Sequence, residues 1–184
     1  MRPGGFVSGV PDQINYCKQL YVASAGGYTN IRDYTISGQM YVGGAMTGGQ
    51  GYFISTREVT PITFGYPMGY TGFALQFDPV HQRIMLFDGT REVGSYGEGY
   101  WGESYFSQAV SADGFLDFAI TVCGDRIWGL RLGNFNVWRL SGPNPTDLAD
   151  VRLNNVGYGK ISIGSFTEPA TLAPMARNLK IEVR

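Results

Sequence analysis

The sequence predicts an all-β domain, and three observations favour this fold class. Glycine accounts for 27 of the 184 residues and is scattered among aromatic and β-branched residues, as at turns and bulges. Aromatic residues make up 14% of the chain and charged residues only 16%. Short apolar–polar alternations recur between turn signals, and no helical period competes with them. This pattern is typical of a β-sandwich or a β-barrel.

Period-2 alternation and its interruptions define the expected elements. Phe115–Cys123 has one fully apolar face, and Gly124-Asp125 and Gly133-Asn134 are hairpin signals on either side of Arg126–Leu132. In Arg126–Leu132 the alternation puts Trp128 on one face with Leu130 and Leu132. The glycine-rich Gly89–Gly99 is expected to be a loop. Strands are expected over Lys18–Ser24, Tyr34–Val42, Gln50–Val59, Phe73–Phe77, Arg83–Asp88, Phe115–Cys123, Arg126–Leu132, Phe135–Leu140, Asp147–Val156, Gly159–Phe166 and Asn178–Val183.

Charge and hydropathy argue against several function classes. The formal net charge is −1 and no run of Lys or Arg exists, so we expect no nucleic-acid partner. No apolar run approaches the ~18 residues that span a bilayer, so we expect no membrane insertion. Met1–Gly5 lacks the apolar segment of a signal peptide, which predicts a chain that is cytoplasmic or secreted without a signal peptide.

The metal-binding residue types are sparse. His81 is the only histidine, and Cys17 and Cys123 are the only cysteines, so we expect no metal site and no cofactor. Two cysteines do not make a disulfide framework. Cys123 ends an apolar strand and is expected to be a buried thiol, while a Cys17–Cys123 bridge stays open as the alternative.

Three segments follow one another in an order and at a spacing that resemble those of galectins. They are Phe73–Val80, Ile84–Asp88 and Trp101–Ser104, and the strands that follow them extend the resemblance from about Tyr34 to Phe166. The resemblance implies an antiparallel two-sheet β-sandwich, a jelly roll of the galectin and concanavalin type. It also implies a galectin-like domain over residues 31–166, with an N-terminal extension over 1–30. A C-terminal extension over 167–184 has room for one added strand.

The sugar-contacting positions of that family are mostly substituted here. Trp101 is kept, whereas the family's other positions hold Gln76, Asp78, Val80, Asp88, Ser104 and Phe106, with Glu103 and His81 next to two of them. The resemblance therefore implies a carbohydrate-binding site with altered, non-lactose specificity. Its residues are Gln76, Asp78, His81, Asp88, Trp101 and Glu103.

The chemistry of these residue types suits a sugar. A pyranose has a face of C–H groups and an edge of hydroxyls, so an aromatic plate such as Trp101 pairs with polar side chains held on strands. Gln76 and Asp78 are two residues apart and share one strand face, and Asp88 ends the neighbouring strand. His81 and Glu103 supply further hydrogen-bonding groups. The alternatives are a core tryptophan and a solvated polar face.

Three functions compete on this sequence. The first is a carbohydrate-binding lectin, with a glycan or glycoprotein as partner and a homodimer allowed through an edge strand. The second is a galectin-like domain that has lost sugar binding and acts as a protein-interaction or structural module. The third is a glycoside hydrolase using Glu92, Glu98 and Glu103. The acidic signature Glu-x-Asp-x-x-Glu of sandwich glycosidases is absent, so we expect that the chain is not an enzyme.

Overall fold

A computed structural model places the chain in two β-sheets of six strands each. The described residues are 6–8, 20–21, 32–42, 52–58, 72–78, 82–97, 108–141, 145–157, 159–165 and 174–184. Every element, contact and pocket named for the molecule lies within these ranges.

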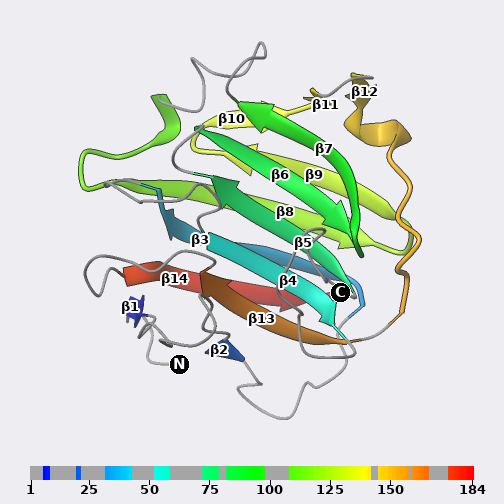
Figure 1. Ribbon diagram of the computed structural model, residues 1–184, viewed down its shortest axis with the longest axis horizontal. Helices are drawn as coiled ribbons and strands as arrows, with labels where there is room; N and C mark the ends of the chain where they lie inside the picture. Colours follow the sequence, from blue (N-terminus) through cyan, green and yellow to red (C-terminus); the bar gives the residue numbers. More distant parts are fainter. Residues whose placement is uncertain are drawn as a thin grey trace.

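Both sheets are antiparallel, and they lie face to face (Figure 1). Sheet A has the order β1 (Phe6–Ser8), β14 (Pro174–Val183), β3 (Tyr34–Tyr41), β8 (Phe115–Cys123), β9 (Arg126–Leu132) and β10 (Phe135–Val137). Sheet B has the order β2 (Leu20–Tyr21), β13 (Lys160–Ser165), β4 (Tyr52–Glu58), β5 (Phe73–Asp78), β6 (Arg83–Asp88) and β7 (Arg91–Gly97). The predicted antiparallel β-sandwich is confirmed.

The core fills the space between the two sheets. Every second residue of a strand points into it, as the alternation predicts. Phe118 of β8 meets Phe77 of β5 across the sandwich, edge to face, with ring centroids 5.4 Å apart. Both rings are fully buried. Sheet A contributes Ile36, Met40, Leu116, Phe118, Ile120 and Val122, among others, and sheet B contributes Ile54, Phe73, Leu75, Phe77, Ile84 and Leu86.

Both hairpin signals of the back half are confirmed. Cys123 pairs with Arg126 around Gly124-Asp125, and Leu132 pairs with Phe135 around Gly133-Asn134. Gly124 has φ +59° and Gly133 has φ +54°, conformations that glycine adopts without the steric cost of a Cβ. The expected strands Phe115–Cys123 and Arg126–Leu132 coincide with β8 and β9.

Three expected elements are wrong. The expected loop Gly89–Gly99 contains strand β7, because glycines are tolerated in an edge strand. The expected strand Phe135–Leu140 is interrupted at Trp138, where the chain leaves β10. The expected strand Asp147–Val156 is a short 3₁₀ turn, η1 (Leu148–Asp150), followed by an irregular segment.

A small ribbon closes one edge of the sandwich. It pairs β11 (Arg139–Leu140) with β12 (Thr146–Asp147), and it lies with η1 beside β10 and β7 in Figure 1. Ser141 then exchanges two backbone hydrogen bonds, of 3.0 and 2.7 Å, with Ser95 of β7. The segment after β10 therefore links the end of sheet A to the edge of sheet B.

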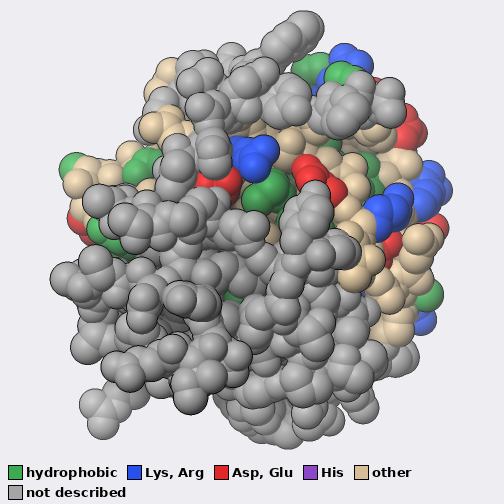
Figure 2. All heavy atoms as spheres, viewed as in Figure 1, with side chains coloured by type: hydrophobic (Ala, Val, Ile, Leu, Met, Phe, Trp, Pro, Cys, Tyr) green, Lys and Arg blue, Asp and Glu red, His purple; other side chains and the backbone are tan. Residues whose placement is uncertain are grey.

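The charges on the described surface are mixed in sign. Figure 2 shows basic and acidic side chains interspersed on the viewed face, without a patch of one sign among the described residues. In the described part of the chain, no helix has the length and apolar character needed to cross a bilayer.

Candidate functional site

The polar pair that the sequence singles out lies on the outer face of sheet B, the face turned away from the core. The core takes Phe73, Leu75 and Phe77 from β5. Gln76 and Asp78 alternate with these residues and point the other way, as predicted. Both are nevertheless buried, with 1% of each residue exposed. A hydrogen bond to a sugar needs an accessible polar atom, so neither side chain is open to a ligand in this structure.

Asp88 does not join this pair. The register of β5 and β6 places Asp78 opposite Arg83, and Phe73 opposite Asp88. The two carboxylates therefore lie at opposite ends of the hairpin, about 17 Å apart on antiparallel strand spacing. The expectation that Asp88 completes a site with Gln76 and Asp78 is wrong.

Asp88 instead anchors the segment that follows η1. The backbone N–H groups of Asn154 and Asn155 donate to its carboxylate, and so does the side-chain amide of Asn155, at 2.8 Å. Arg91 forms an ion pair with it at 3.0 Å. Burial by itself raises the pKa of Asp88, but these donors outweigh it and lower the pKa below its usual range.

A buried guanidinium holds the same segment from the other side. The side chain of Arg57 is fully buried, and its Nη1 donates to the carbonyl oxygen of Asn155 at 2.6 Å. Its Nε and Nη2 donate to the carbonyl oxygen of Arg32, at 3.0 and 2.7 Å. We call Arg57, Asp88 and Asn155 the Asn155 clasp. It fixes the segment that carries η1 against the end of the sandwich.

The other three predicted site residues, His81, Trp101 and Glu103, lie outside the described residues. Cys123 is a free, partly exposed thiol, so the expectation of a buried thiol is wrong, and Cys17, its partner in the alternative bridge, lies outside the described residues. Among the described residues, no group of three or more His, Cys, Asp or Glu side chains is arranged to hold a metal.

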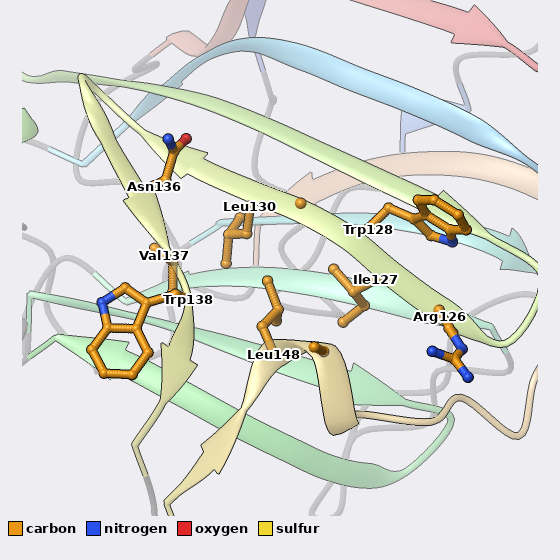
Figure 3. A pocket seen from close by; sticks show the side chains of 10 residues that line it. Arg126, Ile127, Trp128, Leu130, Asn136, Val137, Trp138 and Leu148 are labelled. Carbon is orange, nitrogen blue, oxygen red and sulfur yellow. The ribbon is translucent and has the colours of Figure 1, made fainter.

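A surface pocket lies elsewhere, at the edge of sheet A. Its volume is about 480 Å³, within the range of ~300–1,000 Å³ that is usual for small-ligand sites. β9, the end of β10 and η1 form its walls (Figure 3). The pocket exists because β10 pairs with β9 only as far as Val137, opposite Leu130, before the chain turns away. Apolar side chains that also belong to the core form its floor, namely Ile127, Leu130, Val137 and Leu148.

A β-bulge turns Trp128 outward at this pocket. Thr121 of β8 pairs with Gly129, whereas the next residue, Val122, pairs with Ile127. Trp128 is therefore the extra residue on β9, and a bulge re-aims the side chain at that position. Trp128 is 72% exposed, while Ile127 is buried in the core. The expectation that Trp128 shares a face with Leu130 and Leu132 is wrong for this reason.

Trp138 is the second aromatic side chain of the pocket. It follows Val137, the last residue of β10, and its carbonyl oxygen accepts a hydrogen bond from the N–H of Leu148 at 2.8 Å. This bond fixes η1 beside the tryptophan. The residue is 65% exposed. Trp128 and Trp138 are the two most exposed large apolar residues of the described chain.

Two polar side chains complete the wall. Arg126 carries the only charge among the described lining residues, and Asn136 adds an amide. The Arg126 Nε lies 3.9 Å from Asp125, and both side chains are half-exposed, so this ion pair is weak and leaves guanidinium donors for a ligand. The described lining thus combines two aromatic plates with a few hydrogen-bonding groups.

The sequence contains a signal for this pocket that the alternation obscured. Ile127 and Leu130 are both apolar and three residues apart, which strict alternation does not allow on one face of a strand. A bulge between them resolves the conflict and exposes Trp128. Trp138 directly precedes the ribbon that leaves the sheet, so its exposure follows from the end of β10.

Comparisons with known proteins support the fold. No protein-family model matches the chain. No curated protein matches it in sequence. A solved structure of the carbohydrate binding module CBM66 from Bacillus subtilis is similar to it, with a TM-score of 0.50 and 11% sequence identity. The match covers 97% of this chain and 91% of the module, so the likeness extends over the whole sandwich.

Proposed function

We propose that this chain is a non-catalytic carbohydrate-binding domain. The observation that carries the proposal is the pair of exposed tryptophans at one pocket, since large exposed apolar side chains that line one hollow are typical of a binding surface. The C–H face of a pyranose packs on an indole, and its hydroxyls need donors and acceptors nearby. Trp128 and Trp138 supply the plates, and Arg126 and Asn136 supply the polar groups.

Two further observations support a sugar as the ligand. The solved structure with a similar fold is described as a carbohydrate binding module. The galectin resemblance also points to sugar binding, and its substituted positions favour a glycan other than lactose. In this proposal Trp101 remains a candidate stacking residue, with His81 and Glu103 beside it in the sequence.

The proposal of a binding domain rather than a hydrolase rests on the lining of the pocket. Glycoside hydrolysis needs two carboxyl groups that flank the scissile bond. The described lining residues of the pocket include no Asp or Glu. Binding without turnover is therefore the activity that these groups support.

A glycan array with the full chain tests the function, and three variants locate the site. We expect binding by the unmodified protein that falls at least about tenfold in Trp128→Ala and in Trp138→Ala, which corresponds to about 1.4 kcal/mol. Trp101→Ala tests the site implied by the galectin resemblance. Binding lost only in Trp101→Ala would move the site away from the pocket. A blank array from folded protein would overturn the proposed function.

A protein-interaction module is the second candidate, and the same face favours it. Tryptophan is enriched at the energetic centres of protein interfaces, and β10 is an edge strand of sheet A. Self-association through this face predicts a dimer that Trp138→Ala dissociates. Sedimentation of the two proteins over a range of concentrations distinguishes the cases, because a monomeric wild type argues against pairing through Trp138.

A further inference from the structure

The two tryptophans stand at opposite ends of the pocket rather than together. In Figure 3 the indole of Trp138 lies at one end and that of Trp128 at the other, with Leu130, Leu148 and Ile127 between them. A single pyranose ring that stacks on one indole therefore leaves the other uncovered. We propose that the pocket binds at least two linked sugar residues at once, one stacked on each tryptophan. This inference rests on the proposed function and adds the length of the ligand.

The centre of the pocket is shaped to let a chain pass. Gly129 lines the pocket next to Trp128, and a Cβ added to it would meet no atom within 4 Å. Val137 of β10 and Leu130 of β9 form the last pair between these two strands. The next residue is Trp138 on the chain that leaves β10, and Gly129 on β9. Because Gly129 has no side chain, nothing projects from β9 between Trp128 and Leu130, and we call this open position the trough. A glycosidic linkage that joins two stacked rings crosses this trough.

The floor of the trough is fixed, and so are the backbone positions of the two tryptophans. Ile127, Leu130 and Leu148 are nearly fully buried members of the core. Leu148 is also held through the bond from its N–H to Trp138, and the Asn155 clasp anchors the segment beyond η1. The backbone that carries both tryptophans is therefore held in place, and such preorganisation lowers the entropic cost of binding a ligand of matching length.

Joining two stacking contacts in one ligand raises affinity steeply. Once the first ring is bound, the second binds at the high effective concentration set by the linkage. We therefore expect an oligosaccharide to bind at least about tenfold more tightly than its monosaccharide, with little further gain once both plates are covered. If the pocket binds only one terminal sugar, we expect no such rise in affinity from the monosaccharide to the oligosaccharide.

The test is calorimetry of the full chain against a length series. The probes are the mono- to tetrasaccharides of β-1,4-linked glucose and of β-1,4-linked N-acetylglucosamine, together with the same series built from the strongest glycan on the array. Trp128→Ala and Trp138→Ala are each expected to reduce tetrasaccharide affinity to the level of the monosaccharide. The double variant is expected to abolish binding at this pocket.

Gly129→Val offers a variant that blocks the trough without removing a plate. Its side chain enters open space, and valine is well suited to a strand, so we expect the fold to be kept. Tetrasaccharide affinity is expected to fall at least about tenfold, to the monosaccharide level. Gly157→Val is the matched control, because a Cβ at Gly157 also meets no atom within 4 Å and Gly157 is not among the lining residues.

The outcomes separate the two proposals. Glycan binding that is equally tight for mono- and tetrasaccharides, or that Gly129→Val leaves unchanged, overturns the two-unit pocket and leaves the carbohydrate-binding function standing. No binding of any glycan by folded protein overturns the function, and with it the inference. A step in affinity between mono- and disaccharide that both tryptophan variants remove supports the inference.

Discussion

Two faces of the sandwich carry groups suited to a sugar, and they differ in access. On the outer face of sheet B, Gln76 and Asp78 point away from the core yet are 1% exposed. At the edge of sheet A, Trp128 and Trp138 also point away from the core, and they are 72% and 65% exposed. Pointing out of a sheet is therefore not the same as reaching solvent. Of these four described residues, only Trp128 and Trp138 present their side chains to a ligand.

The position of each strand in its sheet explains part of this difference. β5 lies between β4 and β6, and all six of its residues are buried, so neither of its faces is open. β9 has β10 as its outer neighbour, and β10 is only three residues long. The short partner leaves one end of β9 uncovered, and the bulge at Trp128 directs an indole toward that gap.

The largest effect is expected at the Asn155 clasp, which fixes the segment beyond the pocket wall. Asp88→Ala removes the acceptor for the two N–H groups of Asn154 and Asn155 and breaks the ion pair with Arg91. We expect a loss of about 2–6 kcal/mol in the free energy of unfolding, about 1–3 kcal/mol for each backbone N–H left without an acceptor. Urea denaturation measures it. Asp147→Ala is the control, because its ion pair with Arg139 at 3.6 Å is exposed and worth at most about 1 kcal/mol.

The stabilisation by Asp88 also depends on pH. Because hydrogen bonds lower the folded-state pKa of Asp88, its stabilisation is complete above the unfolded-state value of about 3.9 and is lost as pH falls through the folded pKa. The urea midpoint of the wild type is expected to drop more steeply than that of Asp88→Asn below about pH 4. Parallel curves for the two proteins would show that the carboxylate is not held as described.

A matched pair of amides tests burial on the two faces. Gln76→Ala removes a buried amide and leaves the groups around it without its hydrogen bonds. We therefore expect a loss of about 1–3 kcal/mol in the free energy of unfolding. Asn136→Ala removes an exposed amide at the pocket, and we expect a change within about 0.5 kcal/mol. Thermal and urea denaturation of both variants provide the comparison. Equal effects would contradict the difference in access between the faces.

The sequence predicted the layers of the fold better than their edges. Phe115–Cys123 and Arg126–Leu132 were recognisable because apolar alternation and hairpin glycines are local signals. β7 was not predicted, because Gly94 and Gly97 lower its propensity and pairing with β6 outweighs that cost. Asp147–Val156 alternates like a strand, but hydrogen bonds to Asp88, Arg57 and Trp138 hold this stretch in another shape.

The site was less predictable than the fold, for physical reasons that the residues make clear. The direction of Gln76 and Asp78 follows from strand alternation alone. Their burial depends on packing from distant parts of the chain, which alternation does not encode. The exposure of Trp128 depends on one extra residue in β9, a bulge whose only local trace is the apolar pair Ile127 and Leu130.

The smallest effect on stability is expected at the pocket itself. Trp128→Ala and Trp138→Ala remove side chains that are mostly in water, so we expect each to change the free energy of unfolding by no more than about 0.5 kcal/mol. Phe118→Ala serves as the contrast, because it removes a fully buried ring and is expected to cost about 3–5 kcal/mol.

The stability of these variants shows whether the two tryptophans serve binding or packing. Large side chains that contribute little to folding and yet stay exposed are available for binding, whereas side chains that stabilise the fold need no ligand to account for them. A loss of 2 kcal/mol or more, on the order of a buried side chain, in either tryptophan variant would assign that indole to packing. The pocket would then keep its shape but lose the main argument that a sugar stacks there.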